Sequence, residues 1–348
     1  MTSSAAPFSP PRWFANAHVQ SILPSLRVRK PIIRRRAKHL LECTQTRILD
    51  CGDGVRLIGQ FSQHASSAGE RDAVVLLHGW EGSADSLYVL SLGAHLFALG
   101  CDVVRLNFRD HGASHHLNKE LFHSCRLDEV VGAVLTIQHM LPKSRLSLAG
   151  FSLGGNFALR VAAKAREVGL TIERAVAVCP VLRPHTTMDA IESGSFVYRQ
   201  YFLAKWKRSL RLKQALFPEL YDFKHILAQR SIRTMTQVMV EKYSEFADID
   251  AYLNGYAITG EALAKLDVPS HLLLSLDDPL IPAADLQHLA RNPHLHIETV
   301  PHGGHCGFMD RFSTESWADR YIGELMRNAP LNAQSAQPFP AATAQSAG

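Results

Sequence analysis

The sequence lacks several features that would define whole classes of protein. No apolar run approaches the roughly 20 residues that a membrane-spanning helix needs, and the N-terminus lacks the apolar core of a secretory signal peptide. These absences predict a soluble, cytoplasmic protein that contacts a membrane from one side at most. The cysteines show no CxxC spacing, so we expect buried free thiols with neither a disulfide nor a metal site. They are Cys43, Cys51, Cys101, Cys125, Cys179 and Cys306.

The net charge is small, and motifs for binding nucleic acids or cofactors are absent. The formal net charge is only +5 at pH 7, and no nucleic-acid reader motif or cofactor-binding motif is present, so we expect no nucleic-acid partner and no cofactor. One short segment is basic, and a solvated surface segment is a simpler interpretation of it than a site for anionic phosphates. Its cations are Arg27, Arg29, Lys30, Arg34, Arg35, Arg36 and Lys38.

The apolar runs alternate with helical patterns through most of the chain. An aspartate-glycine turn at 51–54 separates two short strand patterns and predicts a hairpin. Continuous apolar strands then alternate with amphipathic segments, which predicts an α/β fold with a mostly parallel sheet and helices on both faces. The expected strands are 73–77, 103–107, 146–149, 175–179, 271–275 and 294–300, and the expected helices are 86–99, 127–140, 156–168, 283–290 and 314–327.

The alternation stops at about 181–265, where the chain is helical, aromatic and basic. An insertion of this length between strands predicts a helical cap over the strand ends. We therefore divide the chain into a partly disordered N-terminal arm at 1–40, a core in two parts at 41–180 and 266–327, the cap, and a disordered tail at 328–348. Residues 1–11 and the tail are rich in Ala, Ser, Pro and Gln, so we expect both to lie outside the fold.

The segment Gly150-Phe151-Ser152-Leu153-Gly154 lies between an apolar strand pattern and a helical pattern. A serine on a sharp strand-to-helix turn is held in a strained conformation, which requires small residues two positions before and after it. The context favours a nucleophile elbow over an ordinary glycine-rich turn. Ser152 is therefore the candidate nucleophile.

A serine nucleophile needs a base and a group that orients the base. Two adjacent carboxylates, Asp277 and Asp278, follow the strand at 271–275, and His302 and His305 lie in the glycine-rich loop after the last strand. We favour Asp278, because it directly precedes the turn at 279–282, and His305, because it follows two glycines. The two histidines also fit a metal site, but the absence of a neighbouring carboxylate makes that interpretation the weaker one.

The oxyanion of an acyl-transfer reaction needs preorganised N–H donors, each contributing roughly 3 to 4 kcal/mol. The backbone N–H of Leu153, directly after the serine, is one candidate donor. The loop His78-Gly79-Trp80-Glu81-Gly82-Ser83 follows a predicted strand, and Trp80 is the candidate for the second. A simple strand-to-helix turn is the alternative interpretation of this loop.

Together these motifs resemble the α/β-hydrolase superfamily, and more narrowly its YheT-like branch of serine esterases and lipases, which includes mammalian acylglycerol and phospholipid hydrolases. The segments that carry the resemblance are 11–20, 78–83, 122–124, 150–155, 277–279 and 303–308. Trp80 stands where leucine is commoner and Cys125 where glycine is expected. The resemblance implies hydrolysis of short- to medium-chain acyl esters or acylglycerol-type lipids by Ser152, His305 and Asp278.

Two other functions stay open at this point. An acyltransferase would use the same triad, and a non-catalytic binding protein is disfavoured because the triad and both oxyanion loops are present. The aromatic residues of the cap suggest an acyl-binding channel. Peripheral contact with an anionic membrane follows if Lys205, Lys207, Arg208 and Arg211 face outward; a cap with core aromatics and solvated cations is the equal alternative.

Overall fold

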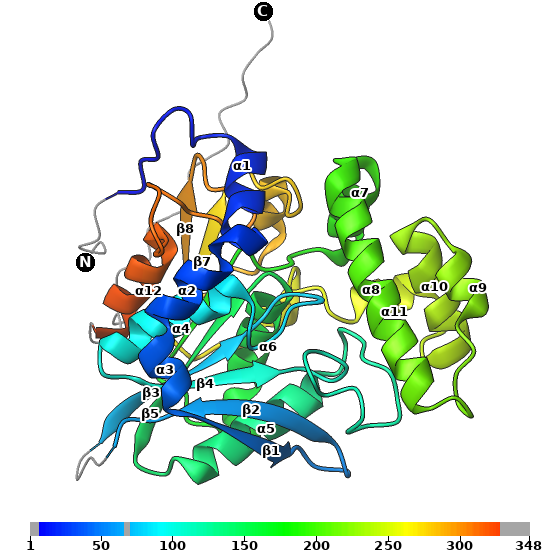
Figure 1. Ribbon diagram of the computed structural model, residues 1–348, viewed down its shortest axis with the longest axis horizontal. Helices are drawn as coiled ribbons and strands as arrows, with labels where there is room; N and C mark the ends of the chain where they lie inside the picture. Colours follow the sequence, from blue (N-terminus) through cyan, green and yellow to red (C-terminus); the bar gives the residue numbers. More distant parts are fainter. Residues whose placement is uncertain (1–6, 66–69, 328–348) are drawn as a thin grey trace, which may run out of the picture.

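An eight-stranded sheet forms the centre of the protein, in a computed structural model that describes residues 7–65 and 70–327 (Figure 1). The strand order is β1-β2-β4-β3-β5-β6-β7-β8. Strands β1 and β2 form the predicted antiparallel hairpin, β2 also pairs antiparallel with β4, and all later pairs are parallel. The strands are β1 Thr44–Asp50, β2 Arg56–Ser62, β3 Arg71–Leu77, β4 Asp102–Asn107, β5 Ser144–Phe151, β6 Arg174–Val178, β7 Ser270–Ser275 and β8 Leu295–Val300. The α/β fold expected from the alternation of patterns is confirmed.

Helices cover the sheet in two groups. Helix α4 (Leu87–Ala98) packs against α12 (Trp317–Arg327), and α5 (Leu127–Met140) packs against α6 (Leu153–Val168). Every residue of β4, β6 and β7 is buried, which explains their continuous apolar patterns. Two helical expectations need correction: 283–290 is a 3-10 helix, η4 (Ala283–His288), and the last helix begins at Trp317 rather than at 314.

The N-terminal arm is ordered over most of its length. It contains α1 (Ala17–Ile22), η1 (Leu23–Ser25), η2 (Arg27–Arg29), α2 (Lys30–Arg36) and α3 (Lys38–Glu42), drawn in dark blue in Figure 1. The expectation that residues up to 11 lie outside the fold is wrong for Phe8, which is buried and packs its ring against Phe308 and Trp317. The composition of a Ser- and Pro-rich segment does not show that one aromatic side chain within it packs into an apolar site. Residues 1–6 and the predicted tail lie outside the described residues.

A helical insertion separates β6 from β7 and stands to one side of the sheet in Figure 1. Its helices are α7 (Pro184–Ser193), α8 (Phe196–Leu216), α9 (Lys224–Ala228), α10 (Ile232–Tyr243) and α11 (Ile249–Asn254), followed by η3 (Glu261–Leu263). The long helix α8 packs against α7 and α10, and α11 contacts the core directly: Tyr252 Oη donates to Ser124 Oγ at 3.2 Å. We keep the name cap for residues 181–265; its boundaries remain an interpretation of the sequence. Among the helices of the described residues, none has both the length and the apolar character that crossing a membrane requires.

Candidate active site

Ser152 sits at the turn between β5 and α6 in a strained backbone conformation. Its φ is 53° and its ψ is −120°, a region that residues with a Cβ rarely occupy. The turn is tight because the neighbouring glycines approach other backbone: a Cβ on Gly150 would lie 2.1 Å from the carbonyl oxygen of Gly154, and one on Gly154 would lie 2.3 Å from that of Leu77. Larger residues at these two positions would displace the serine.

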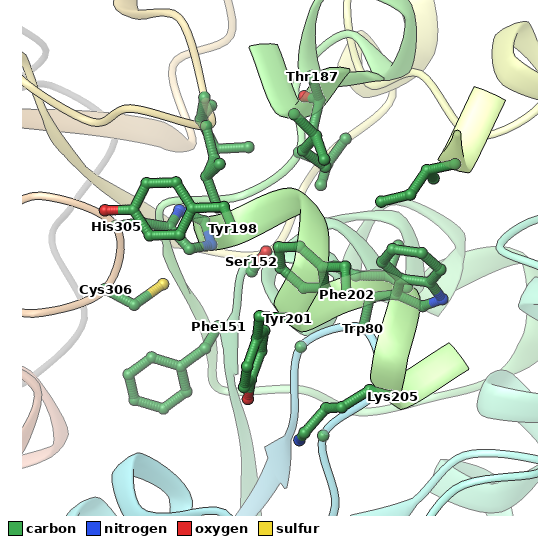
Figure 2. Close-up of a pocket in the computed structure, with 18 of the residues that line it drawn as sticks. Trp80, Phe151, Ser152, Thr187, Tyr198, Tyr201, Phe202, Lys205, His305 and Cys306 are labelled. Carbon is green, nitrogen blue, oxygen red and sulfur yellow. The ribbon is translucent and has the colours of Figure 1, made fainter. Parts of the chain in front are cut away.

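His305 and Asp278 form a partly buried hydrogen-bonded pair near this serine (Figure 2). The imidazole Nδ1 lies 2.9 Å from Asp278 Oδ2 and 3.2 Å from Oδ1. The Asp278 side chain has no solvent exposure, and its Oδ1 also accepts the N–H groups of Leu280 and Ile281. An acceptor fixed at Nδ1 leaves Nε2 as the ring nitrogen that can take a proton. Ser152 and His305 line the same pocket (Figure 2).

The charge on Asp278 changes the titration of His305. Burial lowers the pKa of this imidazole, but the nearby Asp278 carboxylate and the Cys306 thiol group outweigh burial and hold the pKa well above its ordinary value. The imidazolium that forms when a base accepts a proton is thus stabilised by an anion at its far nitrogen.

Asp277 contacts the same loop at a different place. Its Oδ1 accepts the N–H of Gly304 at 2.8 Å and the hydroxyl of Ser275, and its Oδ2 lies 3.3 Å from Nδ1 of the half-exposed His302. The two adjacent aspartates therefore serve two histidines of one loop, and only Asp278 bonds to the histidine that lines the pocket.

Helix α1 of the N-terminal arm packs against the loop that carries His305. Ser21 Oγ accepts the backbone N–H of His305 at 2.8 Å. The fully buried Gln20 donates to the carbonyl oxygens of Phe14 and Met309 and accepts the N–H of Met309. Sequence reasoning did not assign these two residues to the site. The motif at 11–20 was the available signal, but nothing in it showed which loop it would contact.

The loop after β3 lies directly against the serine. A Cβ on Gly79 would stand 3.3 Å from Ser152 Cβ, and the Gly79 N–H donates to Tyr88 Oη at 3.0 Å. The N–H of Glu81 donates to Nε2 of the buried His111 at 3.1 Å. These contacts hold the loop that carries Trp80 against Ser152. The donor roles of Trp80 and Leu153 stay predictions.

A pocket of about 310 Å³ opens above the serine, between the sheet and the cap. Trp80 stacks on Phe202 with ring centroids 5.3 Å apart (Figure 2). It also meets Trp206 edge-on, with ring centroids 5.3 Å apart. The remaining walls are mostly apolar and come from α7, α8, α10 and the N-terminal arm; they include Ile22, Leu26, Met188, Ile191, Tyr198, Tyr201, Ile232 and Met239.

The orientation proposed for the basic residues of the cap is wrong for Lys205. Its ammonium donates to the carbonyl oxygen of Glu81 at 2.9 Å, and the side chain lines the pocket (Figure 2). Lys207 is partly buried and donates to the carbonyl oxygen of Gln229, whereas Arg208 and Arg211 are exposed. Lys205 lies three residues after Phe202 on α8, so the two side chains share a face of the helix and Lys205 reaches the loop after β3.

The parallel sheet, the serine elbow and the histidine-aspartate pair at the carboxyl ends of the strands define an α/β hydrolase. A family model described as the alpha/beta hydrolase family matches residues 74–315, and the chain belongs to this family.

Several known proteins resemble the chain over most of its length. It is 27% identical over 315 residues to YheT of Escherichia coli (strain K12), which carries the name of an esterase, covering 88% of each chain. It is 22% identical to the phospholipase ABHD3 of Bos taurus, over 87% of this chain and 73% of that one. The esterase Pf2001 of Pyrococcus furiosus shares the fold with a TM-score of 0.55 at 18% identity, covering 82% of this chain and 91% of the other.

Proposed function

We propose that the protein is a serine esterase that cleaves carboxylic esters through an acyl-enzyme intermediate. One observation carries the proposal: the strained Ser152 and the Asp278-bonded His305 line one largely apolar pocket. A serine hydroxyl is a poor nucleophile near neutral pH and needs such a base. The names of the similar proteins, an esterase and a phospholipase, support the same reaction class.

In the proposed mechanism, Nε2 of His305 accepts the Ser152 proton as Oγ attacks the ester carbonyl. Asp278 holds Nδ1, fixes the tautomer and stabilises the imidazolium. The oxyanion rests on the N–H groups of Trp80 and Leu153. The imidazolium then protonates the departing alkoxide, and a water activated by His305 releases the acid.

The pocket favours an acyl chain over a charged substrate group. Its walls are mainly aromatic and aliphatic, and its volume of about 310 Å³ is at the lower end of the range for small-molecule sites. Short- to medium-chain acyl esters and acylglycerol-type lipids fit such a lining. Lys205 is a cation in the pocket wall, and its ammonium donates a hydrogen bond to the Glu81 carbonyl oxygen rather than facing a membrane.

Hydrolysis of a chain-length series of p-nitrophenyl esters tests this function. Wild-type protein should turn over some members of the series and react with a fluorophosphonate probe, whereas Ser152→Ala should lose both activities and keep its circular dichroism spectrum. Ser195→Ala, at the half-buried N-cap of α8 and outside the pocket lining, is the matched serine control. Retained hydrolysis by purified Ser152→Ala would overturn the proposal. Faster formation of a new ester than of free acid, with an added alcohol, would instead indicate an acyltransferase.

We further propose that the protein meets its ester substrates at an anionic membrane through the face formed by η2 and α2. On this face the apolar side chains of Val28 and Ile32 are 74% and 56% exposed. The exposed cations around them are Arg27, Lys30, Arg34 and Arg35. Leu26, at the start of the same segment, lines the pocket. Exposed apolar residues among cations suit an interface with anionic lipid headgroups.

Co-sedimentation with vesicles tests the membrane proposal. The protein should pellet with phosphatidylglycerol vesicles at low salt and remain in solution with phosphatidylcholine vesicles. Arg34→Glu/Arg35→Glu should abolish pelleting without changing hydrolysis of a dissolved short-chain ester. The charge-matched control Arg208→Glu/Arg211→Glu lies on the cap and should pellet like the wild type. Loss of binding in the cap variant alone, or no pelleting of the wild type, would contradict the assignment to η2 and α2.

A further inference from the structure

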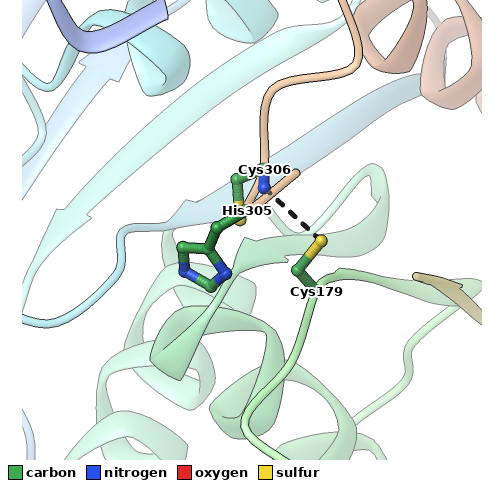
Figure 3. A group of neighbouring side chains, drawn as sticks. All are labelled: Cys179, His305 and Cys306. Carbon is green, nitrogen blue, oxygen red and sulfur yellow. Dashed lines mark hydrogen bonds between the residues drawn. The ribbon is translucent and has the colours of Figure 1, made fainter. Parts of the chain in front are cut away.

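Three possible metal ligands converge beside the proposed catalytic histidine. Cys179 directly follows β6, while His305 and Cys306 are neighbours in the loop after β8 (Figure 3). One ligand atom from each of the three residues lies within 4.8 Å of the other two. Residues 179 and 305 are far apart in the chain, so the cluster exists only in the folded protein. None of its members forms a CxxC-type motif, and the sequence alone predicted no metal site.

The two thiols are held in place by the backbone. The N–H of Cys306 donates to Cys179 Sγ at 3.4 Å, as the dashed line in Figure 3 shows. Cys179 Sγ also lies 3.8 Å from the carbonyl oxygen of Gly304, and Cys306 Sγ lies 3.6 Å from that of Val178. Each thiol therefore contacts the segment that carries the other, which fixes both relative to His305.

We propose that Cys179, His305 and Cys306 form a binding site for a soft divalent cation of the zinc type. Two sulfur ligands and one imidazole are a ligand set that zinc favours, with solvent in the fourth position. Ligand atoms of a tetrahedral zinc site lie roughly 3.5 to 4 Å apart. The ligand atoms of the present cluster lie within 4.8 Å of one another, so shifts of about 1 Å would give that geometry. On binding, each thiol releases its proton to solvent and the neutral imidazole donates a lone pair, so the cation is held by two thiolates and one nitrogen.

A bound cation would occupy a nitrogen that His305 needs in the proposed mechanism. Asp278 bonds to Nδ1 at 2.9 Å, and Nε2 accepts the Ser152 proton. A cation on Nε2 would block the proton transfer, and one on Nδ1 would displace Asp278. Cation binding should therefore inhibit ester hydrolysis reversibly. The inhibition rests on the proposed function, whereas the binding itself does not.

The site is reached through the substrate pocket. His305 and Cys306 line that pocket, and the fully buried Cys179 lies behind them. A hydrated cation can thus meet Cys306 and His305 first and gain Cys179 as it sheds water. An ester in the pocket would block this route, so substrate and cation should compete.

Cadmium absorbance and zinc inhibition test the site independently. Full-length protein, dialysed against chelator and kept under a phosphine reductant, is titrated with cadmium, whose bonds to thiolates give an ultraviolet charge-transfer band. We expect a band that saturates at one cadmium per protein. Zinc should inhibit ester hydrolysis, and chelator should restore it. Cys179→Ala and Cys306→Ser should each weaken cadmium binding by roughly tenfold or more, the loss expected for a disturbed metal site.

Cys125→Ser is the matched control, because Cys125 is also a half-buried free thiol and lies outside the cluster. It should bind cadmium and respond to zinc like the wild type. If the band saturates in wild-type protein and disappears in the Cys179 and Cys306 variants, the metal site is supported. If that protein also shows no esterase activity, the proposed function is rejected while the metal site stands. Absence of the band in wild-type protein, or an unchanged band in both variants, would overturn the metal site.

Discussion

The side chain of Ser21 accepts a hydrogen bond from the backbone N–H of His305 at 2.8 Å, although 284 positions separate the two residues. Gln20 adds three bonds, two to Met309 just beyond the same loop and one to Phe14. Close backbone contact reinforces them: a Cβ on Gly307 would lie 2.1 Å from the carbonyl oxygen of Gln20. The N-terminal arm thus positions the loop that carries the proposed base.

Replacing Ser21 by alanine should lower kcat more than it changes KM. Loss of the bond lets the His305 loop shift, and a displacement of about 1 Å in an active site can cost on the order of 100-fold in rate. We expect a loss of about tenfold or more for Ser21→Ala, measured by steady-state ester hydrolysis. Ser25→Ala, in the same segment and also lining the pocket, should retain near wild-type kcat. Equal losses in the two variants would argue against positioning through His305.

The two adjacent aspartates should differ sharply in their effect on activity. Asp278→Asn removes the anion that fixes the His305 tautomer, and the corresponding change in a serine protease lowers kcat by about 10⁴. Asp277→Asn keeps an acceptor for the Gly304 N–H, so its loss should stay within about tenfold. Steady-state kinetics of both variants, with labelling by a fluorophosphonate, measures the difference. The opposite ranking would transfer the orienting role to Asp277.

Trp80 should limit the length of the acyl chain. Its indole fills the pocket between Phe202 and Trp206, with ring centroids 5.3 Å from each. Trp80→Leu removes part of this wall, so the most rapidly hydrolysed p-nitrophenyl ester should shift to a longer chain. Trp13→Leu, an exposed position outside the pocket, should leave the preference unchanged. An unaltered profile in Trp80→Leu would place the acyl chain elsewhere.

Acid should unfold the protein through histidines that are buried in their neutral form. Burial, with the neighbouring His296 and Arg174, lowers the pKa of His271 on β7 to about 3, against an ordinary 6.5. The pKa is depressed in the folded state, so the stabilisation is complete above pH 6.5 and is lost progressively as the pH falls from 6.5 toward 3. At pH 4 this one group lowers the free energy of unfolding by roughly 3 kcal/mol. Burial lowers the pKa of His78 to about 4 in the same way.

Thermal denaturation between pH 7 and pH 4 measures this effect. The Tm of wild-type protein should fall steeply below pH 6.5, and His271→Asn should flatten the fall relative to its own Tm at pH 7. His116→Asn replaces an exposed histidine and should leave the slope as it is. A slope identical in all three proteins would mean that His271 is not the titrating group.

Local rules were enough to predict the central strands and the serine elbow of this protein from its sequence. Strands buried on both faces must be continuously apolar, and the elbow needs glycines because its backbone is strained. The candidate serine, aspartate and histidine come, in this order, after the carboxyl ends of β5, β7 and β8. This order let the sequence predict Ser152, Asp278 and His305 as the candidate triad. These patterns extend over a few residues, where backbone sterics and side-chain periodicity decide the structure.

Contacts between distant segments were decided only by the tertiary structure. The sequence placed Phe8 outside the fold and Lys205 in solvent, whereas packing buries the first and turns the second toward Glu81. It could not show that Ser21 meets the His305 loop or that Cys179 meets Cys306. Such pairs depend on how whole helices and strands pack to bury apolar surface, a property of the assembled core that no short stretch of sequence encodes.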